Sequence, residues 1–294
     1  DLGPGVRVLA DQGRNCHSQG RSPVCSYCRS GDSHQCEFYS EHGITGLQGA
    51  LAATIAIPAV NCVRLPEGLP AELGALVEPL GCVLHSSDRV ERAQSRYTFS
   101  GPEPIRNILI CGGGPAGLLF LQYLRNIKNF EGLILVSDIR EKNLELARRF
   151  GGTPISAHKT DLGESVRELT HGERIHYLIE AAGNSAIFEQ MPSLLRKQAT
   201  VVPYGHGHKG RDIGLWGNIL FLEPTLVASV GASGGFDADL RPTTYRRALE
   251  LITSGKVLVE PFVTHRYGAL KEIHRAFETD FSRPEYIKGV LNLE

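Results

Sequence analysis

The segment from residue 107 to residue 138 constrains the fold of this chain more than any other. It opens with an apolar run at 108–111, continues as Gly112-Gly113-Gly114-Pro115-Ala116-Gly117, and ends in a second strand-like run that closes at Asp138. Gly112 allows a sharp turn off a strand, Gly114 leaves room for a phosphate near the backbone, and Gly117 lets the following helix lie close to the sheet. The first N–H groups of that helix also favour an anion. These features predict a dinucleotide-binding Rossmann turn rather than an empty strand-to-helix turn, with binding residues Gly112, Gly114, Pro115, Ala116 and Gly117.

The acid that closes the second strand bears on which dinucleotide binds. A carboxylate at Asp138 accepts hydrogen bonds from ribose hydroxyls and repels a 2′-phosphate, which favours NAD over NADP. Arg140 lies two residues further on and leaves an alternative open, because a guanidinium stacks on adenine or binds a phosphate. Further cofactor contacts are expected where later strands end, at Ala182, Gly183, Tyr204, Gly205, Gly231 and Ala232, although ordinary turns explain these positions too.

From Asn107 onward, strand-like and helix-like segments alternate, which is typical of an α/β fold with a doubly wound parallel sheet. Strands are expected at 177–182, 199–202 and 225–230, with helices at 141–150 and 187–195. Residues 6–79 contain short apolar stretches broken by glycine and proline, with a possible pair of strands at 51–60. This earlier part is expected to be rich in β structure.

The overall charge and hydropathy exclude several classes of function. The chain of 294 residues has 31 basic and 32 acidic residues and no run of like charge that would attract nucleic acid or an anionic membrane. No apolar run is long enough for a membrane span, and no signal peptide is recognisable. We therefore expect a cytoplasmic protein that binds neither nucleic acid nor membranes.

Four of the seven cysteines lie between residues 16 and 36. Cys25, Cys28 and Cys36 follow the spacing Cys-x2-Cys-x7-Cys, and Cys16 precedes them; four thiolates from one loop form a closed tetrahedral zinc site, which is structural. His17 and His34 compete with Cys16 for the fourth position. The remaining cysteines, Cys62, Cys82 and Cys111, are expected to be small buried apolar residues.

The order of these motifs, together with Glu78-Pro79-Leu80 and Pro261-Phe262-Val263-Thr264-His265, resembles the zinc-dependent medium-chain alcohol dehydrogenases, most of all the polyol (sorbitol), sugar and threonine dehydrogenases. The resemblance implies a GroES-like catalytic domain at 1–80 and 256–294, with its zinc lobe at 16–36, and an inserted Rossmann domain at 81–255. It also implies zinc and NAD as cofactors, a secondary alcohol (polyol, sugar or amino alcohol) as substrate, and a homodimer or homotetramer.

Two departures from the family pattern stand out. Eight residues separate Cys16 from Cys25, where the family has two. The family's catalytic-zinc cysteine and His-Glu pair would lie upstream of the first residue, so we expect the sequence to begin inside the catalytic domain. Glu78 then matches the remaining metal-linked acid of the family and is the candidate catalytic residue and metal ligand, or else a cap for the helix that follows.

Three other interpretations stay open or are disfavoured. A non-catalytic NAD-binding or assembly fragment remains the alternative to an enzyme. A zinc ribbon for nucleic acid lacks a basic surface. His206 and His208 suggest a metal site less than a polar loop, because no acid or cysteine adjoins them, and Trp216 is expected to pack against the protein or a second subunit.

Overall fold

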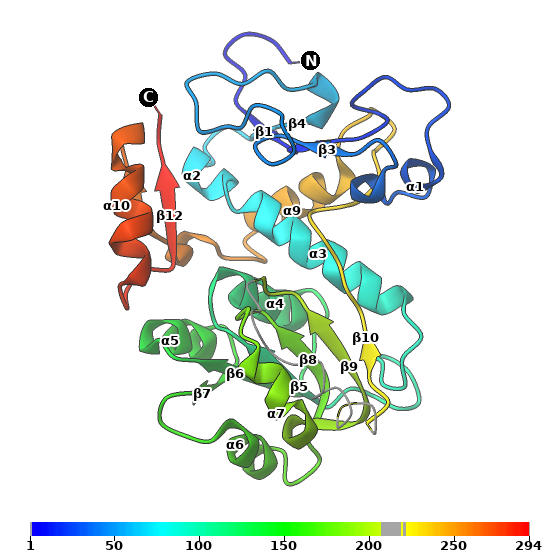
Figure 1. Cartoon of the computed structure of the whole chain (residues 1–294), viewed down its shortest axis with the longest axis vertical. Coiled ribbons are helices and arrows are strands. Elements are labelled where there is room, and N and C mark those ends of the chain that lie inside the picture. Colours follow the sequence, from blue (N-terminus) through cyan, green and yellow to red (C-terminus); the bar gives the residue numbers. More distant parts are fainter. Residues whose placement is uncertain (1, 207–218, 220–221, 294) are drawn as a thin grey trace. The chain divides into compact units, whose positions relative to one another are not determined.

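The computed structural model describes residues 2–206, 219 and 222–293 (Figure 1). Contacts between residues divide the chain into a first unit, Asp1–His85 with Val230–Glu294, and a second unit, Ser86–Ser229. The insert predicted from the sequence, 81–255, extends beyond the second unit at both ends, and further at the carboxyl end. His208 and Trp216 lie outside the described residues, so the roles expected for these two side chains stay predictions.

The described residues of the second unit form a six-stranded parallel sheet in the order β10-β9-β8-β5-β6-β7 (Figure 1). Its strands are β5 (Asn107–Cys111), β6 (Leu133–Asp138), β7 (Thr153–Ser156), β8 (Ile175–Glu180), β9 (Leu195–Pro203) and β10 (Thr225–Leu226). The chain runs outward from β5 to β7 and then returns to the other side of β5 with β8. This order is that of a Rossmann fold, and the point between β5 and β8 is where such sheets bind ligands. The predicted α/β fold class is confirmed.

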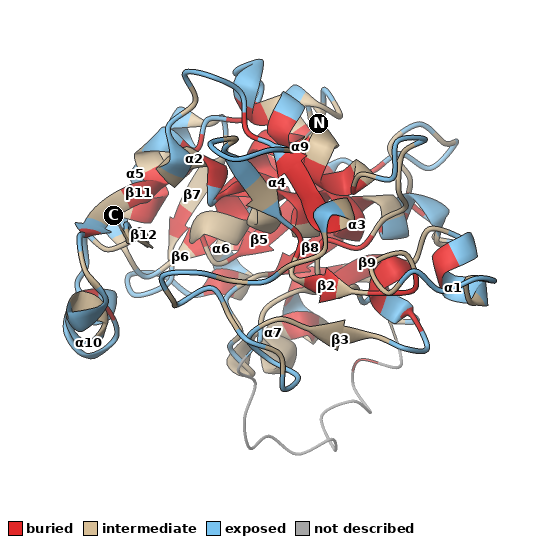
Figure 2. Cartoon of the chain, turned by 90° about the horizontal axis from the view of Figure 1, so that it is seen from above, coloured by how far each residue is buried: buried red, intermediate tan, exposed pale blue. Residues whose placement is uncertain are grey.

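Helices connect these strands and bury the sheet. They are α4 (Pro115–Asn126), α5 (Glu141–Arg149), α6 (Leu162–Leu169) and α7 (Ala186–Leu194). Every residue of β5 and β8 is buried, as the red sheet in Figure 2 shows, because a parallel sheet covered on both faces needs apolar side chains on both. The core includes Leu109, Leu135, Leu178 and Val201.

Two elements of the second unit were not expected from the sequence. Strand β7 contains Pro154 and pairs only with β6, at the edge of the sheet, where a missing N–H donor is tolerated. Helix α6 begins after Asp161, whose carboxylate accepts a hydrogen bond from the N–H of Glu164 at 2.8 Å. Both elements are short, with four residues in β7 and eight in α6.

The described residues of the first unit contain three two-stranded sheets. Strand β1 (Val8–Ala10) pairs with β4 (Cys62–Arg64) and β2 (Gly13–Arg14) with β3 (Ser40–Glu41), both antiparallel, whereas β11 (Val263–Tyr267) and β12 (Lys288–Leu291) are parallel. The α-helices are α1 (Ser26–Arg29), α2 (Ala71–Gly74), α9 (Thr243–Thr253) and α10 (Ile273–Glu278), with α3 (Val77–Arg92) running on into the second unit. Short 3-10 helices lie at Ser33–Gln35, Ala59–Asn61, Glu260–Phe262, Leu270–Glu272 and Asp280–Ser282.

The pair of strands considered for residues 51–60 is absent. These residues are exposed or half-buried throughout and end in the 3-10 helix at Ala59–Asn61. A strand needs one face packed on a core to fix its pairing, and this segment has no such face.

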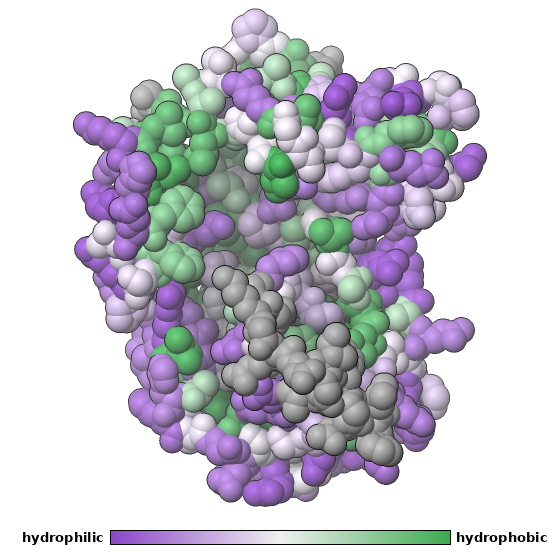
Figure 3. All heavy atoms as spheres, in the orientation of Figure 1, coloured by the Kyte–Doolittle hydropathy of each residue, from purple (hydrophilic) through white to green (hydrophobic). Residues whose placement is uncertain are grey.

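Figure 3 shows hydrophilic side chains over much of the visible surface of the molecule. In the part of the chain that the structure describes, each helix is too short or too polar to cross a lipid bilayer.

Candidate functional site

The turn between β5 and α4 has the geometry that its glycines predicted. Gly112 has φ +97°, and a Cβ there would lie 2.8 Å from the backbone nitrogen of Ala182. A Cβ on Gly117 would lie 1.9 Å from the carbonyl oxygen of Gly112. A Cβ on Gly114, by contrast, would meet no atom within 4 Å. Two glycines are therefore required by the backbone itself, while the third opens onto free space at the start of the helix.

Helix α4 begins beside this space without a side-chain cap. Gly114 is its N-cap residue and Pro115 its first residue, which has no N–H to satisfy. The next N–H groups, at Ala116 and Gly117, lack partners within the helix, as in every α-helix. The helix dipole adds partial positive charge at the same point, so the turn offers an anion two donors and a favourable field.

The carboxylate of Asp138 lies at the end of β6, beside the turn. Its Oδ2 accepts hydrogen bonds from the N–H of Gly113 at 2.7 Å and from Nδ2 of Asn143 at 3.1 Å. Its Oδ1 accepts one from the N–H of Arg140 at 2.7 Å, and Arg140 is the N-cap residue of α5. A carboxylate has about four acceptor positions, so one is left for a ligand hydroxyl. The structure thus brings Asp138 and Arg140 to the glycine turn.

Glu180, the last residue of β8, is a site residue that was not predicted from the sequence. Its side chain is fully buried, and Oε1 accepts hydrogen bonds from the N–H groups of Ala182 at 2.9 Å and Gly183 at 2.8 Å. Its carbonyl oxygen accepts two more, from the N–H groups of Tyr204 at 2.9 Å and Gly205 at 2.7 Å. Glu180 therefore holds together four of the residues that were expected near the cofactor. The signal for it was present, since this acid directly follows the apolar run from Tyr177 to Ile179.

The loops that Glu180 holds are closely packed. A Cβ on Gly183 would lie 2.1 Å from the carbonyl oxygen of His206, and one on Gly205 would lie 2.3 Å from the nitrogen of Gly183. The ring of Tyr204 packs edge-to-face on Phe120 of α4, with centroids 5.1 Å apart. The close approach of the loop after β8 and the loop after β9 requires glycine at 183 and 205, with or without a bound cofactor.

Gly231 was also expected among the cofactor residues. It belongs to the first unit, has φ +62°, and a Cβ there would lie 2.2 Å from Nδ1 of His34. The neighbouring Ala232 is buried. Close packing against His34 accounts for the glycine, and its role in cofactor binding stays a prediction.

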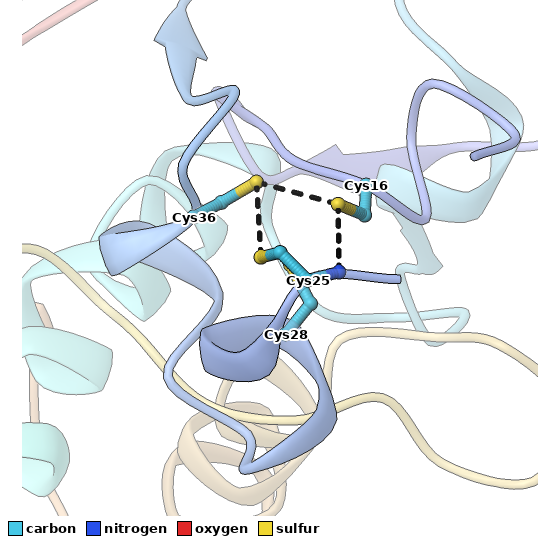
Figure 4. A group of neighbouring side chains, drawn as sticks. All are labelled: Cys16, Cys25, Cys28 and Cys36. Atoms are coloured by element: carbon cyan, nitrogen blue, oxygen red, sulfur yellow. Dashed lines mark hydrogen bonds between the residues drawn. The ribbon is translucent and has the colours of Figure 1, made fainter. Parts of the chain in front are cut away.

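The four cysteines of the first unit converge, as Figure 4 shows. Their sulfur atoms all lie within 4.8 Å of one another, with Cys16 and Cys36 3.6 Å apart and Cys25 and Cys36 3.9 Å apart. Four sulfurs bound tetrahedrally at the usual Zn–S length of about 2.3 Å are about 3.8 Å apart. The cluster Cys16, Cys25, Cys28 and Cys36 therefore fits a zinc ion, and the long spacing before Cys25 does not prevent Cys16 from joining it.

Neither of the histidines that compete with Cys16 joins this cluster. Both His34 and Asp11 are buried, with Nε2 of His34 3.4 Å from Oδ1 of Asp11, and the ring of His17 packs on Phe236 with centroids 4.6 Å apart. In the described chain, the four cysteines are the group of metal-binding side chains that comes together.

The thiols of the cluster differ in their acidity. A hydrogen bond from the backbone of Cys28 lowers the pKa of Cys25 to about 6, whereas burial raises the pKa values of Cys28 and Cys36. Two thiols are thus held protonated by their surroundings. Binding of a cation at the cluster favours the thiolates, so metal uptake here releases protons.

Glu78 lies in a polar network of the first unit. Its Oε1 accepts hydrogen bonds from Nε2 of Gln12 at 3.4 Å and from the thiol of Cys82 at 3.1 Å. The same Gln12 nitrogen donates to Glu41, and Gln12 Oε1 accepts from the hydroxyl of Tyr245 at 2.9 Å. Within the described residues, no group of three metal-binding side chains includes Glu78. These residues do not complete a catalytic metal site, and the roles given to Glu78 stay predictions.

The remaining cysteines fall into two groups. Cys62 and Cys111 are buried, as expected of small apolar residues, and burial raises the pKa of both thiols. Cys82 was expected to behave in the same way but is only half-buried and contacts the Glu78 carboxylate.

Comparison with known proteins supports these assignments. Residues 115–254 match the family described as zinc-binding dehydrogenase. Sorbitol dehydrogenase of Arabidopsis thaliana is 29% identical over 295 residues, which cover 98% of this chain and 73% of the relative, and L-idonate 5-dehydrogenase of Vitis vinifera is 27% identical over 299 residues, covering 100% and 74%. An Escherichia coli alcohol dehydrogenase in complex with NADH has the same fold, with a TM-score of 0.76, 21% identity, and coverage of 99% of this chain and 80% of its own. These matches support the resemblance to the zinc-dependent medium-chain alcohol dehydrogenases that the sequence motifs predicted.

Proposed function

We propose that the chain is an oxidoreductase that transfers a hydride from a secondary alcohol to NAD. The observation that carries this proposal is the glycine turn, where an open position at Gly114 and the uncapped start of α4 lie beside the Asp138 carboxylate. This combination provides donors for a pyrophosphate and an acceptor for a ribose hydroxyl. When bound, the nicotinamide supplies the hydride acceptor and the zinc of such enzymes supplies a Lewis acid.

Asp138 supports NAD rather than NADP. Three hydrogen bonds fix its carboxylate, so it cannot turn away from a 2′-phosphate without breaking them. A fixed negative charge disfavours a second negative charge at the same place. The backbone of Arg140 is part of this arrangement, which gives that residue a role in holding Asp138.

The four-cysteine cluster supports a structural zinc in the same protein. Four thiolates leave no open position for a substrate, so the ion would hold the lobe at 16–36 rather than take part in the reaction. Because the described residues around Glu78 offer no complete ligand set, we derive no reaction step through a metal there.

The relatives support a proposal for the class of substrate. The two described above are dehydrogenases of sorbitol and of L-idonate, a polyol and a sugar acid. We accordingly propose a polyol, a sugar or an amino alcohol as the substrate, with oxidation at a secondary hydroxyl. A homodimer or homotetramer in the cytoplasm remains part of the proposal and is testable by light scattering and cell fractionation.

One observation favours a second candidate function. Within the described residues Glu78 belongs to no group of three metal-binding side chains, which fits a subunit that binds NAD or assists assembly without catalysis. Both candidates require the dinucleotide turn, and they differ in whether the protein turns over an alcohol.

The proposal is tested by three measurements on the purified chain. We expect NADH to bind with enhanced fluorescence and more tightly than NADPH, and zinc to be present by elemental analysis. One zinc per chain indicates the structural ion alone, whereas two support a working catalytic site. NAD reduction with sorbitol or L-idonate then separates the enzyme from the non-catalytic candidate. Failure to bind either nucleotide would contradict both.

A further inference from the structure

The pairing of β9 with β8 contains an irregularity that presents charged side chains. Ile175 pairs with Leu195, but Tyr177 pairs with Thr200, so residues 196–199 bulge out of the ladder. Gln198 lies in this bulge with φ +61°, a conformation that non-glycine residues rarely adopt. Bulges of this kind redirect side chains and occur often beside functional sites.

The bulge is fixed to the segment that precedes β10. The N–H of Gln198 donates to the carbonyl oxygen of Leu222 at 2.6 Å, and its Nε2 donates to Glu223 at 2.8 Å. Glu223 also has a positive φ, of 47°. Two strained residues thus hold each other, and such strain persists only where the surrounding structure enforces it.

A cavity of about 540 Å³ lies against this bulge, within the second unit. Its volume is in the range of sites that bind small molecules. The side chains that line it and matter here are Arg96, Tyr97, Arg196, Lys197, Gln198 and Glu223. We call this cavity the bulge pocket.

Among the residues that the structure describes, three cations and one acid line the bulge pocket. Lys197 is exposed and has no hydrogen bond or ion pair with any described residue. Arg196 donates from Nε to the hydroxyl of Tyr97 at 3.0 Å and from Nη1 to the carbonyl oxygen of Glu173 at 3.3 Å, and among the described residues it has no carboxylate partner. A lysine and an arginine adjacent in sequence therefore keep their full charge at one wall.

The third cation is partly compensated. Arg96 donates to Gln198 Oε1 at 3.0 Å and pairs with Glu103 at 3.2 Å, and its guanidinium lies 5.7 Å from the centre of the Tyr97 ring. The lining acid, Glu223, accepts its hydrogen bond from Gln198. The described lining residues thus carry a net positive charge, and their unused guanidinium donors point to an oxyanion as ligand.

The bulge pocket is distinct from the dinucleotide turn. It lies at the amino end of β9, whereas the turn follows the carboxyl end of β5. In a parallel sheet the amino ends of the strands lie on one side and their carboxyl ends on the opposite side. The cofactor binds at the side of the carboxyl ends. A pyrophosphate at the turn therefore does not occupy the bulge pocket.

We propose that the bulge pocket binds a small molecule that carries a phosphate group, with Arg96, Arg196 and Lys197 as its charged contacts. This is a second site on the Rossmann unit, in addition to the nucleotide site. Its affinity for phosphate depends on salt, because Lys197 and Arg96 are exposed to solvent and their charges are screened.

Calorimetric titration of the full chain with inorganic phosphate at low ionic strength tests the proposal. With the glycine turn saturated by NADH, we expect one binding event that Lys197→Gln weakens by about fivefold or more, and that the double variant Lys197→Gln with Arg96→Gln removes. Lys197→Arg should retain binding, because it keeps the charge.

Lys271→Gln is the matched control, since Lys271 is an exposed lysine of the first unit and should leave the titration unchanged. NADH fluorescence and circular dichroism of each variant report on the nucleotide site and the fold. Identical phosphate isotherms for the wild type and the double variant would overturn the proposal, and so would the absence of phosphate binding. Binding that Lys271→Gln weakens equally would indicate nonspecific attraction and would overturn it as well.

Discussion

The dinucleotide turn and the cysteine lobe are both short, glycine-containing segments, but they are held in different ways. The turn rests on β5, which is buried throughout, and on α4, which is buried from Gly117 to Leu124, so its shape is fixed by packing before any ligand arrives. In the lobe, the cysteines themselves are the core, joined by Val24 and Tyr39. Burial of so few apolar groups cannot offset the entropy of ordering the loop. One site is preformed by the fold, whereas the other depends on its ligand.

Removal of the metal is the strongest way to test this difference. We expect Cys28→Ser, or treatment with a chelator, to cost the first unit about 5 kcal/mol or more, because zinc binding supplies folding free energy to such lobes. Hydrogen exchange should become fast at residues 13–41, while β5 and β8 stay protected. Cys62→Ser is the control, since Cys62 is a buried cysteine of the same unit outside the cluster. If the lobe stays protected from hydrogen exchange after zinc is lost, its fold does not depend on the metal and the contrast with the glycine turn is wrong.

The glycine turn should respond to a change of packing rather than to loss of a ligand. Gly117→Ala places a Cβ 1.9 Å from a carbonyl oxygen and should destabilise the second unit by about 3 kcal/mol. Gly114→Ala meets no atom and has φ −70°, so its stability should stay within about 0.5 kcal/mol of the wild type. Urea unfolding measures both.

The affinity for NADH, measured per folded molecule, should rank the two alanine variants in the reverse order to their stability. We expect the larger loss of affinity in Gly114→Ala. The methyl group of Gly114→Ala occupies the space left for a pyrophosphate, so NADH affinity should fall by about tenfold or more. Fluorescence titration of this well-folded variant gives the value. Wild-type affinity in Gly114→Ala would show that the phosphate does not approach the helix at this point.

The same contrast explains what the sequence could predict. The turn and the cysteine cluster were both recognisable because their residue types and spacings are dictated by local geometry, at Gly112 and Gly117 in one case and at Cys25 and Cys28 in the other. The long gap before Cys25 left the place of Cys16 open, and only the folded loop brings its sulfur to the other three.

Features that depend on distant segments were missed. The acid at Glu180 was visible, but its four partners come from two loops that meet only in the folded sheet. The bulge at 196–199 depends on the register between two strands, which no local pattern in β9 specifies. Strand β7 was hidden by Pro154, which is acceptable only because the strand lies at the edge of the sheet.

Acidification should weaken the preformed unit by a mechanism of its own. Burial, reinforced by the charge of Arg196, lowers the pKa of His176 from 6.5 to about 4. Above pH 6.5 the ring is neutral in both states and its contribution to stability is complete. As the pH falls from 6.5 towards 4, His176 becomes protonated in the unfolded chain but stays neutral in the folded chain. The free energy of unfolding therefore falls by about 3 kcal/mol.

Urea unfolding at several pH values between 4 and 6.5, followed by circular dichroism, measures this loss of stability. The variant His176→Gln removes the titrating group, so its stability should depend less on pH over the same window. His158→Gln is a control at an exposed histidine of the same unit. Equal slopes for the wild type and His176→Gln would show that other groups carry the pH dependence.

The smallest effect should be seen at Asp138, where the preformed turn meets its ligand. Asp138→Asn keeps the shape of the side chain but removes its charge and gives it an N–H2 group among three donors. We expect NADH affinity to fall by about tenfold, or about 1.4 kcal/mol, and the preference for NADH over NADPH to narrow because the 2′-phosphate is no longer repelled. Asp161→Asn is the matched control, since that carboxylate also accepts a backbone hydrogen bond, at the start of α6. If Asp138→Asn lowers NADH and NADPH affinity by the same factor, the carboxylate shapes the turn without selecting the cofactor, and the preference must come from other groups such as Arg140.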